Sequence, residues 1–471
     1  MVSKFVIYDL ALLALFTFVT VVFLYKRKHN LQRQGLLYLY RTKVGIRFIE
    51  WTSRKFPRTL YYSQYIVIIS GYILMIAMTY ILIRFSYFYI TSPIAAQVLK
   101  VPVIVPLIPY LPEIFNLDFL PPFYFTYWII IIAIIAIPHE FAHGIFARLN
   151  KIRIHSTGFG FLGPFLAAFV EQDEKDMEKA AKFPQLAVLA AGTFANIIFT
   201  LIFGILFWLF FVSAFTPAGV IFSSYATTAV PVSGIELIDG KVVSSIKEIP
   251  NIVDMNESFI PIQVNKQIYF VSPKQLIISI EKNVNDIAVF LDSPAFREKL
   301  TGVIIEVDNV KTTSFDQLRE ILNKKSPGDS IEIRTLQPNK EIKDYKIKLS
   351  EIDGRAFLGI GIIPPQTRGL LGWVYRFITE IKDPFVYYES SLGDIGFFIY
   401  HLLWWAVLIS ISVALVNMLP LGIFDGGRFF YLTIWGITGS KKIGEKAFKF
   451  STYLFLFILA ALMVRWLFIF I

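Results

Sequence analysis

Apolar residues gather into six runs that are long enough to cross a lipid bilayer. In chain order these runs cover residues 5–25, 65–90, 123–147, 184–214, 395–437 and 450–471. A membrane-spanning helix needs about 20 consecutive and mainly apolar residues, because only a continuous helix satisfies its backbone polar groups inside lipid. Pro420 and Gly422 interrupt the fifth run, so we expect a break there. The pattern predicts a polytopic α-helical membrane protein with about six spans.

Residues 217–370 follow a different pattern. Apolar and polar positions alternate with a period of two in stretches such as GVIIEVDNV (302–310) and SIEIRTL (330–336), which is typical of half-buried β-strands. The same segment holds 18 basic and 19 acidic residues. It is therefore predicted to be a soluble α+β domain that is inserted between membrane spans.

These patterns divide the chain into four parts. Residues 1–120 form an N-terminal two-span region that ends in a proline-rich segment, which we expect on the outer side of the membrane. Residues 121–216 form the first half of a membrane core, and residues 217–370 form the inserted domain. Residues 371–471 complete the membrane core and add the last span.

The composition agrees with a bilayer as part of the solvent. Apolar residues make up 55% of the 471 residues and charged residues only 17%, whereas charged residues are about 25% of an ordinary soluble protein. Three soluble domains, which this length would otherwise suggest, are thereby excluded. The absence of cysteine excludes a disulfide scaffold, a cysteine-ligated zinc ribbon and a thiol nucleophile.

The net charge of +10 is informative through its distribution along the chain. Residues 26–58 contain ten basic residues and a single acidic one, Glu50, and lysines cluster again at 441–449. Basic residues concentrate on the cytosolic side of membrane spans, so both segments are expected in the cytosol. Six crossings then place both termini and residues 217–370 outside a cell membrane. The charge pattern indicates the lipid bilayer as a partner, and no nucleic acid is expected.

The sharpest chemical signal is the motif His139-Glu-Phe-Ala-His143. Residues four apart lie on one face of a helix, so both imidazoles can reach one metal ion. Glu140 follows the first histidine and can accept a proton from a water molecule at the metal. The same motif occurs by chance on soluble helices, but here it ends the apolar run WIIIIAIIAIP. Ionisable residues within a span are costly and generally functional, so the motif predicts a metal site inside the membrane.

A third metal ligand is expected on another span, because a catalytic zinc site usually has three protein ligands and one open position. Residues 402–424 contain no ionisable side chain, and Asp425 follows them directly. Pro420 and the pair Gly426-Gly427 allow the helix to unwind there and to direct the carboxylate. A plain cytosolic end of a helix is the alternative interpretation.

Four segments together resemble the site-2 protease family of intramembrane zinc proteases. They are HEFAH (139–143), AFVE (168–171), AAGTFAN (190–196) and NMLPLGIFDGG (417–427). The specific feature is the pattern N-x-x-P-x-x-x-x-D-G-G on a span that follows the HExxH span. Two positions depart from the family pattern, since Phe424 replaces the usual leucine and Leu166-Ala167 replaces Pro-Gly.

The resemblance implies roles for particular residues. The implied Zn²⁺ ligands are His139, His143 and Asp425. Glu140 would be the catalytic acid and base, and Asn417 would hold the substrate or the oxyanion. Gly192 and Asn196 match the G-x-x-x-N signature of the family and would lie near the place where substrate enters.

The inserted domain resembles a PDZ domain over residues 293–336. This segment has a small-residue entry, a strand, a helix at 315–324, a Pro-Gly turn and a second strand, and RAFLGIGI (355–362) would supply a later strand. PDZ domains bind peptides by adding them to a sheet edge. Residues 220–290 fit less well and are either an insertion or a second, degenerate module. A generic α+β domain that only caps the active site is the alternative.

The sequence as a whole predicts an intramembrane zinc metalloprotease that cleaves single-span membrane proteins, which a site-1-type protease has already trimmed outside. One alternative is a catalytically inactive membrane scaffold that presents a PDZ-like peptide-binding domain, and another is a metal transporter. The intact Glu140 and three intact ligands argue against the scaffold. The scarcity of other polar residues in the spans argues against the transporter.

Three smaller features complete the predictions. The G-x-G-x-x-G motif at 158–163 follows a membrane span, so a re-entrant hairpin is predicted there and a dinucleotide site is not. His155 follows the basic Arg153 and is predicted to be an interface side chain, not a fourth ligand. Asp9 lies within the first apolar run, and the sequence identifies no partner for it.

Overall fold

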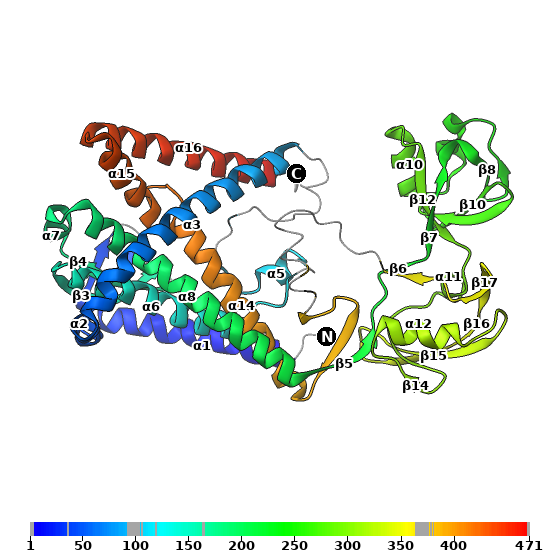
Figure 1. The fold of residues 1–471 in the computed structure, drawn as a ribbon, viewed down its shortest axis with the longest axis horizontal. Coiled ribbons are helices and arrows are strands. Elements are labelled where there is room, and N and C mark those ends of the chain that lie inside the picture. Colours follow the sequence, from blue (N-terminus) through cyan, green and yellow to red (C-terminus); the bar gives the residue numbers. More distant parts are fainter. Residues whose placement is uncertain are drawn as a thin grey trace. The chain divides into compact units, whose positions relative to one another are not determined.

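The computed structural model describes residues 4–34, 37–91, 104, 107–117, 120–162, 165–362, 376, 379 and 381–468. The chain forms two compact units (Figure 1). Unit 1 comprises Met1–Phe210 and Phe397–Ile471, and unit 2 comprises Phe211–Gly396. Most of the proline-rich segment before residue 107 lies outside the described residues.

Six helices of the described residues are long and apolar enough to cross a membrane, which confirms the predicted polytopic helical protein. They are α1 (Lys4–Lys26), α3 (Pro57–Thr91), α6 (Phe125–Leu149), α8 (Lys182–Ala214), α14 (Gly393–Asn417) and α16 (Lys441–Leu467). Helix α16 begins before the apolar run at 450, because the Ser440 side chain accepts a hydrogen bond from the N–H of Ile443 and caps the first turn.

The predicted break in the fifth run is confirmed. Helix α14 ends at Asn417, and a shorter helix, α15 (Asp425–Thr438), begins after a loop. Proline lacks the N–H that a helix interior requires, and Pro420 lies in this loop. A side chain at Gly427 would have its Cβ 2.4 Å from the carbonyl oxygen of Leu421. The glycine therefore allows the start of α15 to fold back against the loop.

Unit 1 also contains a four-stranded antiparallel sheet. Its strands, in spatial order, are β1 (Leu31–Gln34), β2 (Leu37–Thr42), β3 (Ile154–Leu162) and β4 (Phe165–Gln172). The β3–β4 hairpin is the one predicted around 158–170. A Cβ at Gly158 would lie 2.1 Å from the backbone oxygen of Tyr40, so glycine is needed where β2 and β3 approach each other. The β1–β2 hairpin is an addition to the predicted elements, because the charge pattern of residues 26–58 indicates the side of the membrane and not the secondary structure.

Shorter helices connect these elements. They are a 3-10 helix η1 (Lys28–Asn30), α2 (Ile46–Lys55), α5 (Leu111–Ile114) and α7 (Glu174–Lys179). Helix α2 packs against α6 near the C-terminal end of that span, and α7 follows β4. Helices α2 and α7 therefore lie at the ends of α6, which carries the HExxH motif, and of β4, which carries the AFVE segment.

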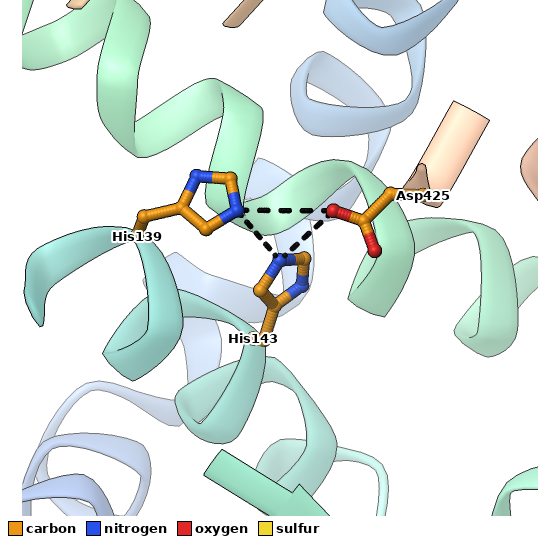
Figure 2. A group of neighbouring side chains, drawn as sticks. All are labelled: His139, His143 and Asp425. Carbon is orange, nitrogen blue, oxygen red and sulfur yellow. Dashed lines mark hydrogen bonds and ion pairs between the residues drawn. The ribbon is translucent and has the colours of Figure 1, made fainter. Parts of the chain in front are cut away.

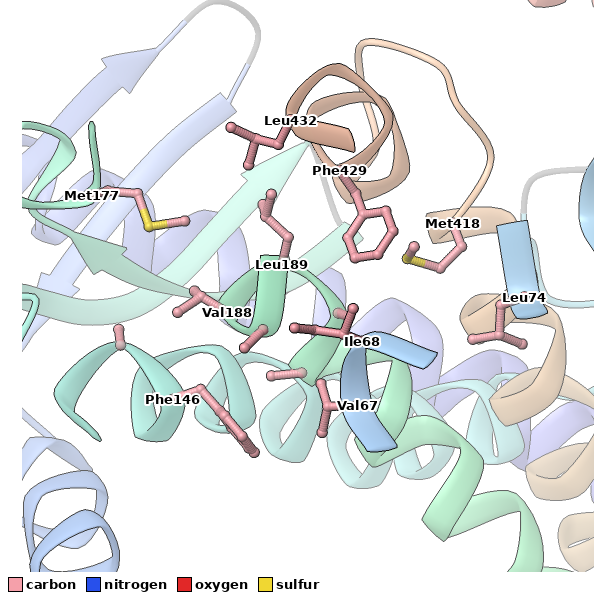
Figure 3. Packing of buried hydrophobic residues seen from close by; sticks show 14 of the residues in the cluster. Val67, Ile68, Leu74, Phe146, Met177, Val188, Leu189, Met418, Phe429 and Leu432 are labelled. Carbon is pink, nitrogen blue, oxygen red and sulfur yellow. The ribbon is translucent and has the colours of Figure 1, made fainter. Parts of the chain in front are cut away.

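The core of unit 1 places α8 in close contact with its neighbours (Figure 3). Val67 and Phe146 pack with Val188 and Phe429 in one buried cluster, which joins α3, α6, α8 and α15. Helix α8 contributes small side chains to this cluster: Ala187, Ala190 and Ala191. Small residues let membrane helices approach closely, so α8 is held tightly beside α6.

Asp9 is buried and has several partners. Its carboxylate accepts hydrogen bonds from the N–H groups of Phe125 and Thr126, both at 2.8 Å, at the start of α6. The hydroxyl groups of Thr126 and Tyr110 also donate to it. The first N–H groups of a helix have no partner within the helix, so α1 supplies a capping carboxylate to the span that carries the HExxH motif.

Unit 2 contains two six-stranded sheets. The first has the order β16-β15-β13-β5-β20, with β14 on β13. Its strands are β5 (Phe215–Val220), β13 (Val303–Val307), β14 (Val310–Lys311), β15 (Ser330–Leu336), β16 (Ile342–Lys348) and β20 (Val386–Ser390). Helix α12 (Phe315–Asn323) packs with this sheet through Leu318. Strand β20 pairs with β5 along its length, so the unit includes residues beyond 370.

The second sheet explains the poor fit of residues 220–290 to a PDZ pattern. Its order is β7-β12-β11-β10-β8-β9, with β7 (Thr227–Pro231), β8 (Ile235–Ile238), β9 (Lys241–Val242), β10 (Ile260–Val264), β11 (Gln267–Val271) and β12 (Asp286–Leu291). Strands β7 and β12, the first and last of the six in the sequence, pair with each other. The chain therefore enters and leaves this sheet at neighbouring strands. The sheet has its own buried core, which includes Ile238, Ile262 and Val289.

Two small strand pairs and five short helices complete the described part of the inserted region. Two small strand pairs join β17 (Ser350–Ile352) to β18 (Arg355–Phe357) and β19 (Ile360–Gly361) to β6 (Ser224–Tyr225). The short helices are η2 (Val232–Gly234), η3 (Ile246–Glu248), α9 (Ile249–Ile252), α10 (Pro273–Glu281) and α11 (Pro294–Arg297). The predicted strand–helix–strand order of residues 293–336 is present, while the assignment of a PDZ domain stays a prediction.

Candidate metal centre

The two histidines of the motif lie on one face of α6 and approach each other closely (Figure 2). The Nε2 atoms of His139 and His143 are 3.2 Å apart, and each residue is only 6% exposed. Two imidazole nitrogens at this distance have little room for a proton on each of the facing Nε2 atoms. Their arrangement suits a shared electrophile.

Asp425 brings the third donor from α15. Its Oδ2 atom lies 3.3 Å from Nε2 of His143 and 3.8 Å from Nε2 of His139 (Figure 2). One donor atom from each of the three residues lies within 4.8 Å of the others, and no other group of this kind occurs among the described residues. The structure therefore brings together the three predicted ligands, although they are up to 286 positions apart in the chain.

Helix α8 holds the far side of both imidazole rings. The backbone oxygen of Val188 lies 2.7 Å from Nδ1 of His143, and the side-chain amide of Asn196 lies 3.0 Å from Nδ1 of His139. A histidine that binds metal through Nε2 keeps its proton on Nδ1 and needs an acceptor there. The Val188 oxygen is such an acceptor.

The Asn196 amide can accept from His139 in the same way. Asn196 is fully buried, and its Oδ1 atom has no hydrogen-bond partner in its present orientation. Rotation of the amide by half a turn exchanges Nδ2 for Oδ1 beside Nδ1 of His139, so that Oδ1 accepts the Nδ1 proton. Both Nε2 atoms are then free of protons and face Asp425.

Gly192 lies between these two contacts on the same stripe of α8. A Cβ at this position would lie 2.3 Å from Nε2 of His143 and 2.6 Å from Nε2 of His139. The missing side chain leaves the space in front of the donor atoms open. The donor set, the oriented imidazoles and this cradle fit a bound metal ion such as Zn²⁺.

The structure also places the other predicted residues near the centre. Oε2 of Glu140 accepts a hydrogen bond of 3.1 Å from the backbone N–H of Val170 in β4. Nδ2 of Asn417, the last residue of α14, lies 3.4 Å from Nε2 of His139. Gly192 and Asn196 contact the histidines, and their role in substrate entry stays a prediction.

Several supporting contacts were missed by sequence reasoning. Arg41 in β2 donates two hydrogen bonds to Glu171 in β4, of 2.8 and 2.7 Å, next to the strand residue that contacts Glu140. The Val188 contact uses a backbone oxygen, which no residue type could signal. His155 is apart from the centre: its Nε2 lies 3.0 Å from Asp173, and its side chain is 54% exposed.

The fold and the site define a class: a polytopic membrane protein with two histidines on a membrane-length helix and one carboxylate that together could hold a metal ion. Residues 127–462 match the profile of peptidase family M50, which covers more than half of the chain. The protein belongs to this family. The resemblance to site-2 proteases is thereby confirmed.

A curated relative agrees with this assignment. The chain is 24% identical over 172 residues to the zinc metalloprotease RasP of Shouchella clausii (strain KSM-K16). The aligned region covers 31% of this chain and 40% of the relative. The chain thus spans less than half the length of the relative that it matches.

Proposed function

We propose that the protein is an intramembrane zinc metalloendopeptidase that cleaves single-span membrane proteins. The observation that carries the proposal is the convergence of His139 and His143, on the membrane-length helix α6, with Asp425 at the start of α15. Two imidazoles and one carboxylate leave an open position on zinc. When bound, zinc supplies Lewis-acid polarisation of a carbonyl group and lowers the pKa of water.

Glu140 is the proposed acid and base. It precedes the second histidine on α6, and its Oε2 is fixed by the N–H of Val170. A carboxylate held in this way can accept a proton from the attacking water and return it to the amine that leaves. Asn417 has an amide N–H group on the same side of the centre. It is proposed to donate a hydrogen bond to the oxygen of the scissile carbonyl.

Strand β4 supports the binding of an unwound substrate. It is an edge strand of the sheet β1-β2-β3-β4, and the N–H of Val170 points away from β3 toward Glu140. Backbone groups two residues apart point to the same side of a strand, so Ala168 also presents its N–H and C=O at this open edge. A substrate segment can pair there in an extended form, which exposes its peptide bonds next to the metal centre.

The proposed topology follows from the charge pattern. Both chain ends and residues 217–370 lie outside the cell membrane, and the segments at 26–58 and 441–449 lie in the cytosol. Unit 2 is proposed to act as a size filter or peptide tether for substrates that a site-1-type protease has trimmed.

The decisive experiment uses the full chain in proteoliposomes with a single-span membrane substrate. We expect cleavage by the wild-type protein, loss of cleavage with a strong chelator, and recovery when Zn²⁺ is restored. Glu140→Gln should retain zinc but lose cleavage, because its amide cannot accept the proton. Equal cleavage by wild type and Glu140→Gln would contradict the proposal.

A further inference from the structure

Helix α2 lies at the membrane surface for a geometric reason. It ends at Lys55, and the membrane-spanning helix α3 begins at Pro57. A single residue, Phe56, separates the two helices. Helix α2 also follows the first span on the same side of the membrane, after the β1–β2 hairpin. Its Glu50 pairs with Arg148, the basic residue in the last turn of the membrane-length helix α6, so α2 lies at the membrane surface.

One face of α2 is fixed against the metal-bearing span. Ile49 is fully buried and lies so close to α6 that a Cβ at Gly144 would be 2.9 Å from its Cδ1. Glu50 pairs with Arg148 of α6 at 2.7 Å. These contacts set the rotation of α2 about its own axis, so the identity of its outward face is determined.

The outward face combines aromatic and basic side chains. Phe48 and Trp51 are each 51% exposed, and Nζ of Lys55 lies 4.7 Å from the centre of the Trp51 ring. Arg47 and Arg54 are exposed on the flank of the same face. The only acidic residue between 26 and 58 is Glu50, which Arg148 already neutralises. The outward face therefore carries positive charge and exposed rings without a neighbouring carboxylate of its own segment.

We propose that this face of α2 is a docking surface for the anionic phospholipid headgroups of the adjoining leaflet. Aromatic rings favour the boundary between headgroups and acyl chains, and arginine and lysine attract lipid phosphate. Phe48 and Trp51 enter this boundary, while Arg47, Arg54 and Lys55 pair with the headgroups. The charge of the face and its level in the membrane favour lipid as the occupant over an acidic protein.

The docking surface contacts a residue of the HExxH motif, Phe141. The ring of Phe48 lies 5.9 Å from the ring of Phe141, which follows Glu140. A Cβ at Gly45 would lie 2.4 Å from the tip of the Phe141 ring, and the positive φ of 88° at Gly45 also favours glycine. The inference does not depend on the proposed protease activity, because lipid docking can be measured in a protein that cleaves nothing.

The test uses the natural absence of cysteine. The full chain carrying Phe48→Cys is labelled with an environment-sensitive fluorophore and placed in nanodiscs of phosphatidylcholine alone or mixed with phosphatidylglycerol. In the mixed discs we expect a blue-shifted emission, a several-fold loss of quenching by neutral acrylamide, and quenching by a nitroxide lipid. The same label attached to Ser326→Cys in unit 2 should show none of these changes.

The contribution of the positive charge is tested by neutralising it with Arg47→Gln, Arg54→Gln and Lys55→Gln combined. This variant should lose the difference between the two lipid compositions. The matched control removes the same charge from exposed lysines of unit 2, with Lys274→Gln, Lys282→Gln and Lys324→Gln, and should keep the difference. Equal protection of the label in both lipids would overturn the proposal, as would protection that appears only when another protein is added.

Discussion

At the scale of single residues, Asn196 determines how His139 presents its metal-binding nitrogen. Asn196→Leu removes the acceptor for the Nδ1 proton, so we expect the affinity for Zn²⁺ to fall about 10–100-fold, as for other partners of metal-bound histidines. Asn196→Asp keeps an acceptor and should retain most of the affinity. Competition with a chromophoric chelator measures both values. An unchanged affinity in Asn196→Leu would show that α8 does not orient His139.

Gly192 offers a second test at the same scale, because it makes room for both imidazoles. Gly192→Ala should abolish stoichiometric metal binding, since its Cβ would overlap Nε2 of His143. Gly204 lies on the same helix, and nothing lies within 4 Å of a Cβ added there. Gly204→Ala should therefore bind metal like the wild type. Metal content by mass spectrometry, with helicity by circular dichroism, distinguishes the two variants.

At the scale of elements, helix α1 caps the first turn of the span that carries the HExxH motif. Asp9→Ala leaves the N–H groups of Phe125 and Thr126 without an acceptor, which should lower the free energy of unfolding by about 1–3 kcal/mol. Thr17→Ala is the matched control, because the Thr17 hydroxyl donates a hydrogen bond to the backbone oxygen of Leu13 in its own helix. Thermal unfolding in detergent measures both. Equal melting temperatures for the two variants would remove the capping role.

The turn between β13 and β14, which holds Asp308, predicts a pH dependence in unit 2. Burial alone would raise the pKa of Asp308, but hydrogen bonds from Lys325 and from the N–H of Glu332 outweigh it and hold the pKa below the ordinary 3.8. A carboxyl with a lowered pKa stabilises the fold above its unfolded-state pKa, and this contribution is lost as the pH falls through the folded-state pKa. Stability should therefore fall at pH below about 4.

The measurement is hydrogen exchange at the Glu332 amide, which donates to Asp308 at 2.8 Å. Lys325→Met should accelerate this exchange at neutral pH, after correction for the intrinsic rate. The difference from the wild type should shrink as the pH falls through the lowered pKa of wild-type Asp308, because Asp308 is then protonated in both proteins. Lys324→Met removes a neighbouring cation that has no ion pair among the described residues, and it should change nothing.

At the scale of the whole molecule, the charge pattern and the position of the site predict where a substrate is cut. His143 precedes Arg148 by five residues, which is about 7–8 Å along a helix, and Arg148 pairs with Glu50 of the segment expected in the cytosol. The scissile bond should therefore lie in the cytosolic half of the substrate span. Mass spectrometry of the fragments locates it, and a cut in the outer third would contradict the proposed topology.

The parts that sequence predicted well are those that local chemistry decides. Apolar length defines a span without reference to any partner, and six helices of the described residues have this length. The spacing of His139 and His143 places both rings on one helical face. Pro420 and the glycines after Asp425 predict the break that starts α15, because proline cannot continue a helix and glycine tolerates close backbone contact.

The tertiary structure decided the features that need partners far along the chain. The β1–β2 hairpin joins β3 across more than one hundred residues, and neither its strands nor its register follow from local propensity. Asp9 of α1 accepts hydrogen bonds from the N–H groups of Phe125 and Thr126. Its carboxylate therefore caps a different span, α6, which no local pattern around Asp9 indicates. The Val188 contact with His143 uses a backbone carbonyl, which is identical in every residue. The sequence by itself determined the spans and the ligand types, whereas packing of α8 against α6 determined how those ligands are oriented.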